Sequence, residues 1–187
     1  MSIDPFRMRG QAMEDLFYKN VDEKLLANVR EELKIGKAKE ELSAATGIKD
    51  DKVLQTMVKY NISAETIVAF AFIPLVAVAW SDGVLEPRER AAIEKAFLAQ
   101  GVDKNSPAFQ LAQHWLVKKP PSDLVETWKS YMQSLKERMD EGTFSQMRTN
   151  VLDRATKIAK AAGGFLGFGS KISETEQRVL DDLRNAM

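Results

Sequence analysis

The stretch IVAFAFIPLVAVAW, residues 67–80, is the strongest hydrophobic run in the chain and decides the fold class. It is apolar on every side of a helical turn, whereas a helix at a protein surface carries a polar face. Its fourteen residues are too few to cross a bilayer, which takes about 20 apolar residues. The stretch therefore predicts the buried central helix of a globular domain, kinked where Pro74 removes a backbone hydrogen bond.

The next ten residues, SDGVLEPRER at 81–90, carry the spacing of the second half of a calcium-binding EF-hand loop. That half consists of an acid, a turn glycine, an apolar residue and a final acid, which are here Asp82, Gly83, Leu85 and Glu89. The first half must supply oxygen ligands, but those positions hold Val78 and Trp80. An ordinary EF-hand is therefore excluded.

Two interpretations of this acidic turn stay open. In the first, Gly83 provides the positive φ that ends one helix, and Pro87 starts the next helix with acids beside its positive end. In the second, the carboxylates of Asp82, Glu86 and Glu89 converge on a divalent cation such as calcium, magnesium or manganese. So few ligands would hold the ion weakly, because calcium prefers six to eight oxygens. The sequence favours the turn and keeps the metal site as a hypothesis.

The segment KISETEQRVL, residues 171–180, has a residue pattern similar to that of the acidic turn. Ser173 and Glu176 have the spacing of a capping box, in which each side chain bonds the other residue's backbone N–H. Ser173 and Glu176 align with Glu86 and Glu89, which predicts two pseudo-repeated helical hairpins. Gly169 stands where the first copy has Asp82, so the second copy lacks that acid.

Helical periodicity extends over the rest of the chain, and we find no alternating pattern typical of strands. Residues 13–34 place one apolar stripe on a helix, consisting of Phe17, Val21, Leu25, Leu26, Val29 and Leu33. Gly36 is expected to end that helix, and residues 37–46 to form a separate short one. Counting the cap and stop signals predicts an all-α fold, a single compact bundle of about eight or nine helices.

The length of 187 residues suits one folded unit. Residues 1–12 are predicted to be a flexible tail and residues 13–52 an N-terminal helical extension. Residues 53–187 are predicted to form the main helical domain, with the extension packed on it as one unit.

Composition excludes several classes of function. Lys plus Arg and Asp plus Glu number 27 each, so the basic excess typical of nucleic-acid binders is missing. The chain has no Cys and one His, which rules out thiolate metal sites and clusters of imidazole ligands within one chain. The start shows no secretory signal, so cytoplasmic residence is the default expectation, with peripheral membrane association left open. The glycine-rich GGFLGFGS at 163–170 lacks the order of a phosphate-binding loop and is interpreted as an apolar loop or a docking patch.

LVAVAWSDGVLEPRERAAI, residues 75–93, resembles the signature of the TerB-like, tellurite-resistance-associated helical domains, and AAGGFLGFGSKISETEQRVL resembles the second hairpin of that family. The likeness covers roughly residues 53–185. It implies an all-helical cytoplasmic module linked to stress response, with acids near the turn that bind metal. Asp82 and Glu89 match those acids, with Glu86 as a neighbour.

Three functions follow, in order of preference. The first is a non-enzymatic binding or scaffold module with a protein partner and a weak divalent-cation site at Asp82, Glu86 and Glu89. The second is a protein-interaction or oligomerisation domain without metal, which makes contact through the glycine-rich loop or a helix face. The third is an enzyme that uses the carboxylates for acid–base chemistry.

Overall fold

The protein is described here by a computed structural model, which covers residues 5–162 and 172–187. Within those ranges every regular element is an α-helix, which confirms the predicted all-α class. The described helices are α1 (Pro5–Thr46), α2 (Asp51–Lys59), α3 (Ile67–Phe70), α4 (Ile73–Ala79), α5 (Pro87–Ala99), α6 (Pro107–Val117), α7 (Ser122–Lys136), α8 (Glu141–Ala162) and α9 (Glu174–Ala186). The glycine-rich loop at 163–170, including Gly169, lies outside the described residues.

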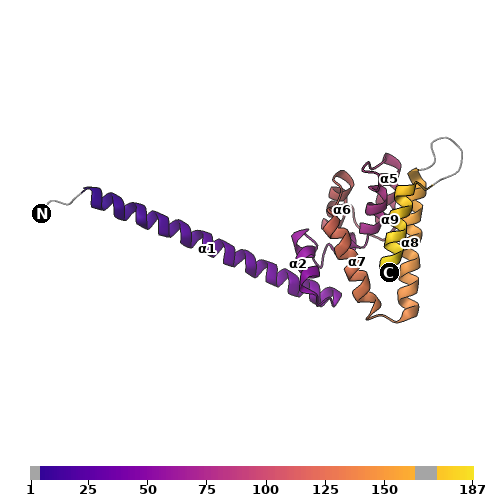
Figure 1. Cartoon of the computed structure of the whole chain (residues 1–187), viewed down its shortest axis with the longest axis horizontal. Helices are drawn as coiled ribbons and strands as arrows, with labels where there is room; N and C mark the ends of the chain where they lie inside the picture. Colours follow the sequence, from indigo (N-terminus) through magenta and orange to yellow (C-terminus); the bar gives the residue numbers. More distant parts are fainter. Residues whose placement is uncertain (1–4, 163–171) are drawn as a thin grey trace.

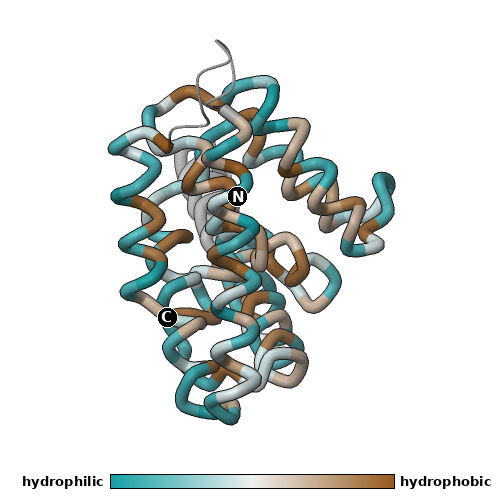
Figure 2. Tube along the Cα trace, turned by 90° about the vertical axis from the view of Figure 1, so that its right-hand side faces the viewer, coloured by the Kyte–Doolittle hydropathy of each residue, from teal (hydrophilic) through white to brown (hydrophobic). Residues whose placement is uncertain are grey.

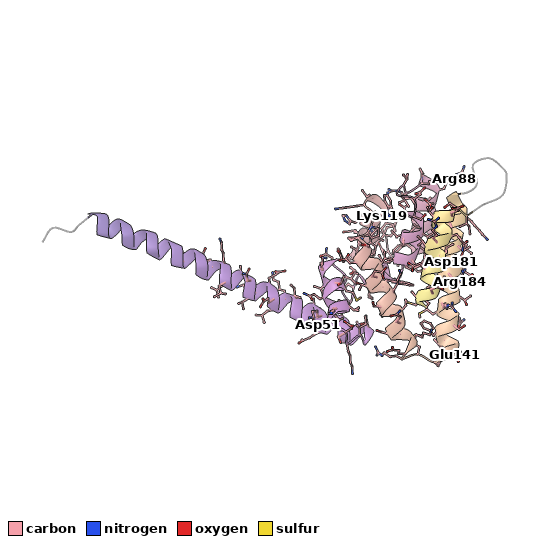
Figure 3. The ribbon with its side chains drawn as sticks, viewed as in Figure 1. Asp51, Arg88, Lys119, Glu141, Asp181 and Arg184 are labelled. Atoms are coloured by element: carbon pink, nitrogen blue, oxygen red, sulfur yellow. The ribbon has the colours of Figure 1, made fainter. Side chains whose placement is uncertain are left out.

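Helix α1 projects from the rest of the protein as a long arm (Figure 1). Its C-terminal end packs mainly on α2, where Leu42 is fully buried and Lys39 forms an ion pair with Asp51. Asp51 marks this joint in Figure 3. We call residues 5–34 of α1 the arm, and every side chain described over residues 23–34 is exposed.

The expected break at Gly36 is wrong, because α1 continues through it to Thr46. Glycine inside a helix costs only about 1 kcal/mol relative to alanine, and the strong helix formers on both sides outweigh that cost. The helix ends at Thr46 instead, and the next residue, Gly47, has a left-handed φ of 71°, which suits a glycine after a helix end.

The remaining helices form a body around α4, which packs against α5, α7, α8 and α9. Hydrophobic and hydrophilic residues alternate along the helices of the body (Figure 2). This pattern lets each helix turn an apolar face inward. The predicted central position of residues 67–80 is confirmed, since the side chains of Phe70, Ile73 and Val76 are fully buried.

The single kinked helix expected over 67–80 is wrong in detail. The stretch forms two short helices, α3 and α4, separated by a turn at Ala71 and Phe72. Pro74 lies in the first turn of α4, where backbone N–H groups have no acceptor within the helix. Proline therefore begins a helix here instead of bending one.

Three phenylalanines from successive segments join the body beside α4. The rings of Phe72 and Phe97 stack with centroids 3.7 Å apart, and Phe109 meets Phe97 edge-on at 6.1 Å. Phe97 is 1% exposed and joins α5 to the turn before α4 and to α6. Together with the contacts between α5 and α8, this cluster holds in place α5, the helix that begins at the acidic turn.

No helix in the described part of the chain is both long and apolar enough to cross a membrane.

Candidate functional site

The acidic turn between α4 and α5 is a tight turn, as the first interpretation predicted. Gly83 has a φ of 91°, and the Val84 N–H donates a hydrogen bond to Asp82 Oδ1 at 3.0 Å. The carboxylate of Asp82 thereby stabilises the turn itself. The side chains of Asp82 and Glu86 are exposed.

Hydrogen bonds to α6 and its end hold this turn in place. The Trp80 indole N–H donates to the Trp115 carbonyl oxygen at 2.8 Å, and Lys119 Nζ donates to the Trp80 carbonyl oxygen at 2.9 Å. Arg90, from the first turns of α5, donates to the Leu116 carbonyl oxygen. Figure 3 shows Lys119 in the upper part of the body together with Arg88, which lies in the first turn of α5.

Glu89 differs from its two predicted partners because it is buried, with an exposed fraction of only 3%. Its Oε2 accepts a hydrogen bond from the Glu86 N–H at 2.9 Å, so it closes the first turn of α5. The position of the side chain is therefore set by helix capping.

The second capping box has the same form and is complete. The Ser173 N–H donates to Glu176 Oε2 at 2.6 Å, and the Glu176 N–H donates to Ser173 Oγ at 3.2 Å. Glu176 is also buried, with 6% of its surface exposed. The capping box predicted for residues 173–176 is confirmed.

The pKa of Glu89 depends on its burial and on the charged groups around it. Burial raises the pKa of Glu89 to about 7, against the effect of the Glu86 N–H bond, which lowers it. The charges of Glu176, Glu86 and Asp82 raise the pKa further, in that order. Glu176 is thus a neighbour of Glu89 that the metal hypothesis did not include.

The three residues of the metal hypothesis lie in different environments. Glu89 faces inward and caps α5, whereas Asp82 and Glu86 lie in solvent. Among the residues that the structure describes, no three His, Cys, Asp or Glu side chains gather as a metal-ligand group. A cation at Asp82, Glu86 and Glu89 would need these side chains to move together.

A second candidate site lies on the arm. Leu25, Leu26, Val29 and Leu33 form what we call the arm stripe, and between 44% and 68% of the surface of each is exposed. Phe17 and Val21, which the sequence placed on the same stripe, lie outside the described side chains. Most exposed hydrophobic residues occur singly, so a row of four on one helix makes the arm stripe a candidate contact surface.

Comparison with known proteins finds no matching family model, curated protein or solved structure.

Proposed function

We propose that this protein is a non-enzymatic interaction module that holds a protein partner through the arm. The observation that supports this proposal is the arm stripe, an apolar surface on a helix whose described contacts with the body lie at its C-terminal end. A helix in a folded protein gains most of its stability when its apolar face packs against other parts of the structure. A partner that covers the stripe would supply that packing.

The spacing of the stripe fits insertion of the arm into an apolar groove of the partner. Leu26, Val29 and Leu33 stand at positions i, i+3 and i+7, which is the pattern by which an amphipathic helix enters a groove. Leu25 widens the same face. The partner is therefore a protein with a hydrophobic cleft about as wide as one helix.

Pairing with a second copy of the arm fits less well. A stable coiled coil needs apolar a and d positions over three to four heptads. Continuing the register of Leu26, Val29 and Leu33 places Asp22 before them and Gly36 and Glu40 after them. Two arms would share too few apolar layers, so the proposal is a different protein with its own apolar wall.

The double variant Leu26→Asp/Leu33→Asp is expected to lose the partner. Burying two carboxylates in an apolar cleft costs several kcal/mol, so affinity falls by roughly a hundredfold or more. The measurement is affinity purification with wild-type and variant bait, followed by titration of each captured protein in purified form.

The matched control is Ala27→Asp/Asn28→Asp, which adds the same two negative charges at exposed positions off the stripe. It should keep the partner. Sedimentation velocity of the wild type checks self-association, and a dimer that the stripe variant dissociates would contradict the choice of a different protein. If every captured protein binds both variants equally, the arm is not the contact.

A divalent-cation site at Asp82, Glu86 and Glu89 remains a second part of the proposal. The observation in its favour is the negative charge around Glu89, where Glu176, Glu86 and Asp82 all raise its pKa. A cation would relieve that repulsion and replace the proton. With few ligands the affinity would be weak, with a dissociation constant on the order of 10⁻⁴ to 10⁻³ M.

Calorimetric titration with calcium, magnesium or manganese is expected to give saturable heat at millimolar metal. Binding should be stronger at pH 8 than at pH 6, because Glu89 must lose its proton, and Asp82→Ala should weaken it. Asp103→Ala, an exposed acid in another turn, serves as control. Metal heats that Asp82→Ala leaves unchanged would remove the cation from the proposal.

The resemblance to the TerB-like family, with its paired hairpins and its link to stress response, is also part of the proposal. Capped turns before α5 and α9 support the paired hairpins. We propose no catalytic role for the carboxylates, because Asp82 and Glu89 accept hydrogen bonds that hold the turn and the cap.

A further inference from the structure

Two adjoining cavities open on the face of the body formed by α4, α5, α7 and α8. The first, of about 410 Å³, lies between α4, α7 and α8, and the second, of about 450 Å³, lies between α5 and α8. Leu75 and Arg154 line both, so the two cavities lie next to each other and share these two residues. We call the combined space the Arg154 groove.

The walls of the first cavity are mostly apolar. Trp128, Tyr131 and Met132 of α7 face Met147 and Val151 of α8 across it. A polar row on α8 forms its rim and ends at Arg154, the row consisting of Thr143, Gln146, Asn150 and Arg154. Helical spacing of three and four residues puts the polar row and the apolar row side by side on one helix.

The charged residues that the structure describes along the groove have one sign. Among the described residues, Arg154 is the only charged one that lines the first cavity, and Lys95 and Lys157 join it in the second. No Asp or Glu is among the described residues that line either cavity. Within the described part of the chain, none of these cations forms a hydrogen bond or an ion pair with another side chain.

This combination selects a class of ligand. Apolar walls favour a hydrocarbon chain, and about 400 Å³ is within the usual size of a small-molecule site. The three cations favour a carboxylate or phosphate at one end of that chain, and Arg154 can bind either with two parallel hydrogen bonds. A cationic or wholly polar ligand would leave one half of the groove without a partner.

We propose that the Arg154 groove binds an amphiphile with one anionic head group, whose chain enters the cavity between α4, α7 and α8 and whose head meets Arg154, Lys95 and Lys157. The head and chain belong to a free fatty acid or to an anionic lipid, and both present the same chemistry. The groove lies on the body, so the proposal is independent of the arm.

The test is a titration of protein labelled with ¹³C at its methionine methyl groups, followed by NMR. Decanoate and decyltrimethylammonium, both below their micelle concentrations, provide the same chain with opposite charge. Decanoate should shift the methyl signals of Met132 and Met147 and saturate them, whereas decyltrimethylammonium should bind at least about tenfold more weakly. Equal response to the two amphiphiles, or no saturable shift at Met147, would overturn the proposal.

Two variants on α8 locate the head group. Arg154→Gln should weaken decanoate binding by about tenfold to a hundredfold, the worth of a hydrogen-bonded charge. Lys160→Gln removes an exposed cation of the same helix that lines neither cavity, and it should leave the affinity unchanged. Equal weakening by both variants would show general attraction to a basic helix and would refute the specific site. Circular dichroism melts check that both variants are folded.

Vesicles of phosphatidylglycerol separate the two sources of the ligand. If the protein sediments with the vesicles, and if free decanoate and Arg154→Gln each prevent this, the groove binds the head group and chain of a lipid. Binding of decanoate without sedimentation assigns it to a free acid. The proposal would be contradicted if the protein sediments with the vesicles regardless of decanoate and of Arg154→Gln, and the methyl signal of Met147 does not shift.

Discussion

The variant Glu89→Gln is expected to be more stable than the wild type above pH 8 and to match it near pH 5. The pKa of Glu89 is about 7 in the folded protein, against 4.5 for an ordinary glutamate, chiefly because the side chain is buried. Glutamine has nearly the same shape and retains an oxygen that accepts the Glu86 N–H. It removes only the charge.

The sign of this pH dependence follows from the difference in proton binding between the folded and the unfolded state. Between pH 4.5 and about pH 7 the folded state holds a proton on Glu89 that the unfolded state releases. The free energy of unfolding therefore falls as pH rises through this range. The stability that protonation contributes is complete below pH 4.5 and lost above pH 7. At about 1.4 kcal/mol per pKa unit, the loss that glutamine avoids amounts to roughly 3 kcal/mol.

Urea unfolding followed by circular dichroism at pH 5, 6, 7, 8 and 9, in buffer with a chelator, measures this difference. Glu65→Gln is the matched control, since Glu65 is exposed and is not among the groups that raise the pKa of Glu89. The stability of this variant should differ little from that of the wild type at every pH. A variant Glu89→Gln that is less stable than the wild type at pH 9 would contradict the expectation. It would mean that ionised Glu89 has a stabilising partner.

The variant Phe97→Ala is expected to lose about 3–5 kcal/mol of unfolding free energy, as is usual when a buried phenylalanine becomes alanine. Phe97 is 1% exposed, stacks on Phe72 at 3.7 Å and meets Phe109 edge-on. Its removal leaves a cavity between α5, α6 and the turn before α4. A loss of this size is a large share of the 5–15 kcal/mol that stabilises an ordinary domain.

Thermal and urea unfolding measure the change, with Leu98→Ala as the control from the same helix. Leu98 is 38% exposed and lies outside the aromatic cluster, so its replacement should cost clearly less. Similar losses for the two variants would mean that the space left by Phe97 collapses.

Local sequence signals predicted the helical class and both capped turns. Gly83 and the Ser173–Glu176 box depend on residues within one turn of each other, so their spacing is visible in the chain. The buried position of α4 followed from a run without polar residues. The error at Pro74 has a local cause as well, because proline in a first turn and proline in a helix interior look alike until the helix start is known.

Long-range features could not be predicted in the same way. The approach of Glu176 to Glu89 joins residues more than 80 positions apart and depends on how α4, α5 and α9 pack. The periodicity of residues 13–34 identified an apolar stripe but carried no information about what covers it. The Arg154 groove combines residues of four helices, none of which forms a motif by itself.

The length of α1 has a mechanical consequence. At about 1.5 Å per residue, its 42 residues extend roughly 60 Å. A partner bound near the N-terminal end of α1 would lie several nanometres from a ligand bound to the body, so the helix would act as a spacer between the two. Rotation of α1 about its contact with α2 would then move the bound partner over a large distance. Deleting whole helical turns would bring the partner closer to the body in steps of about 5 Å.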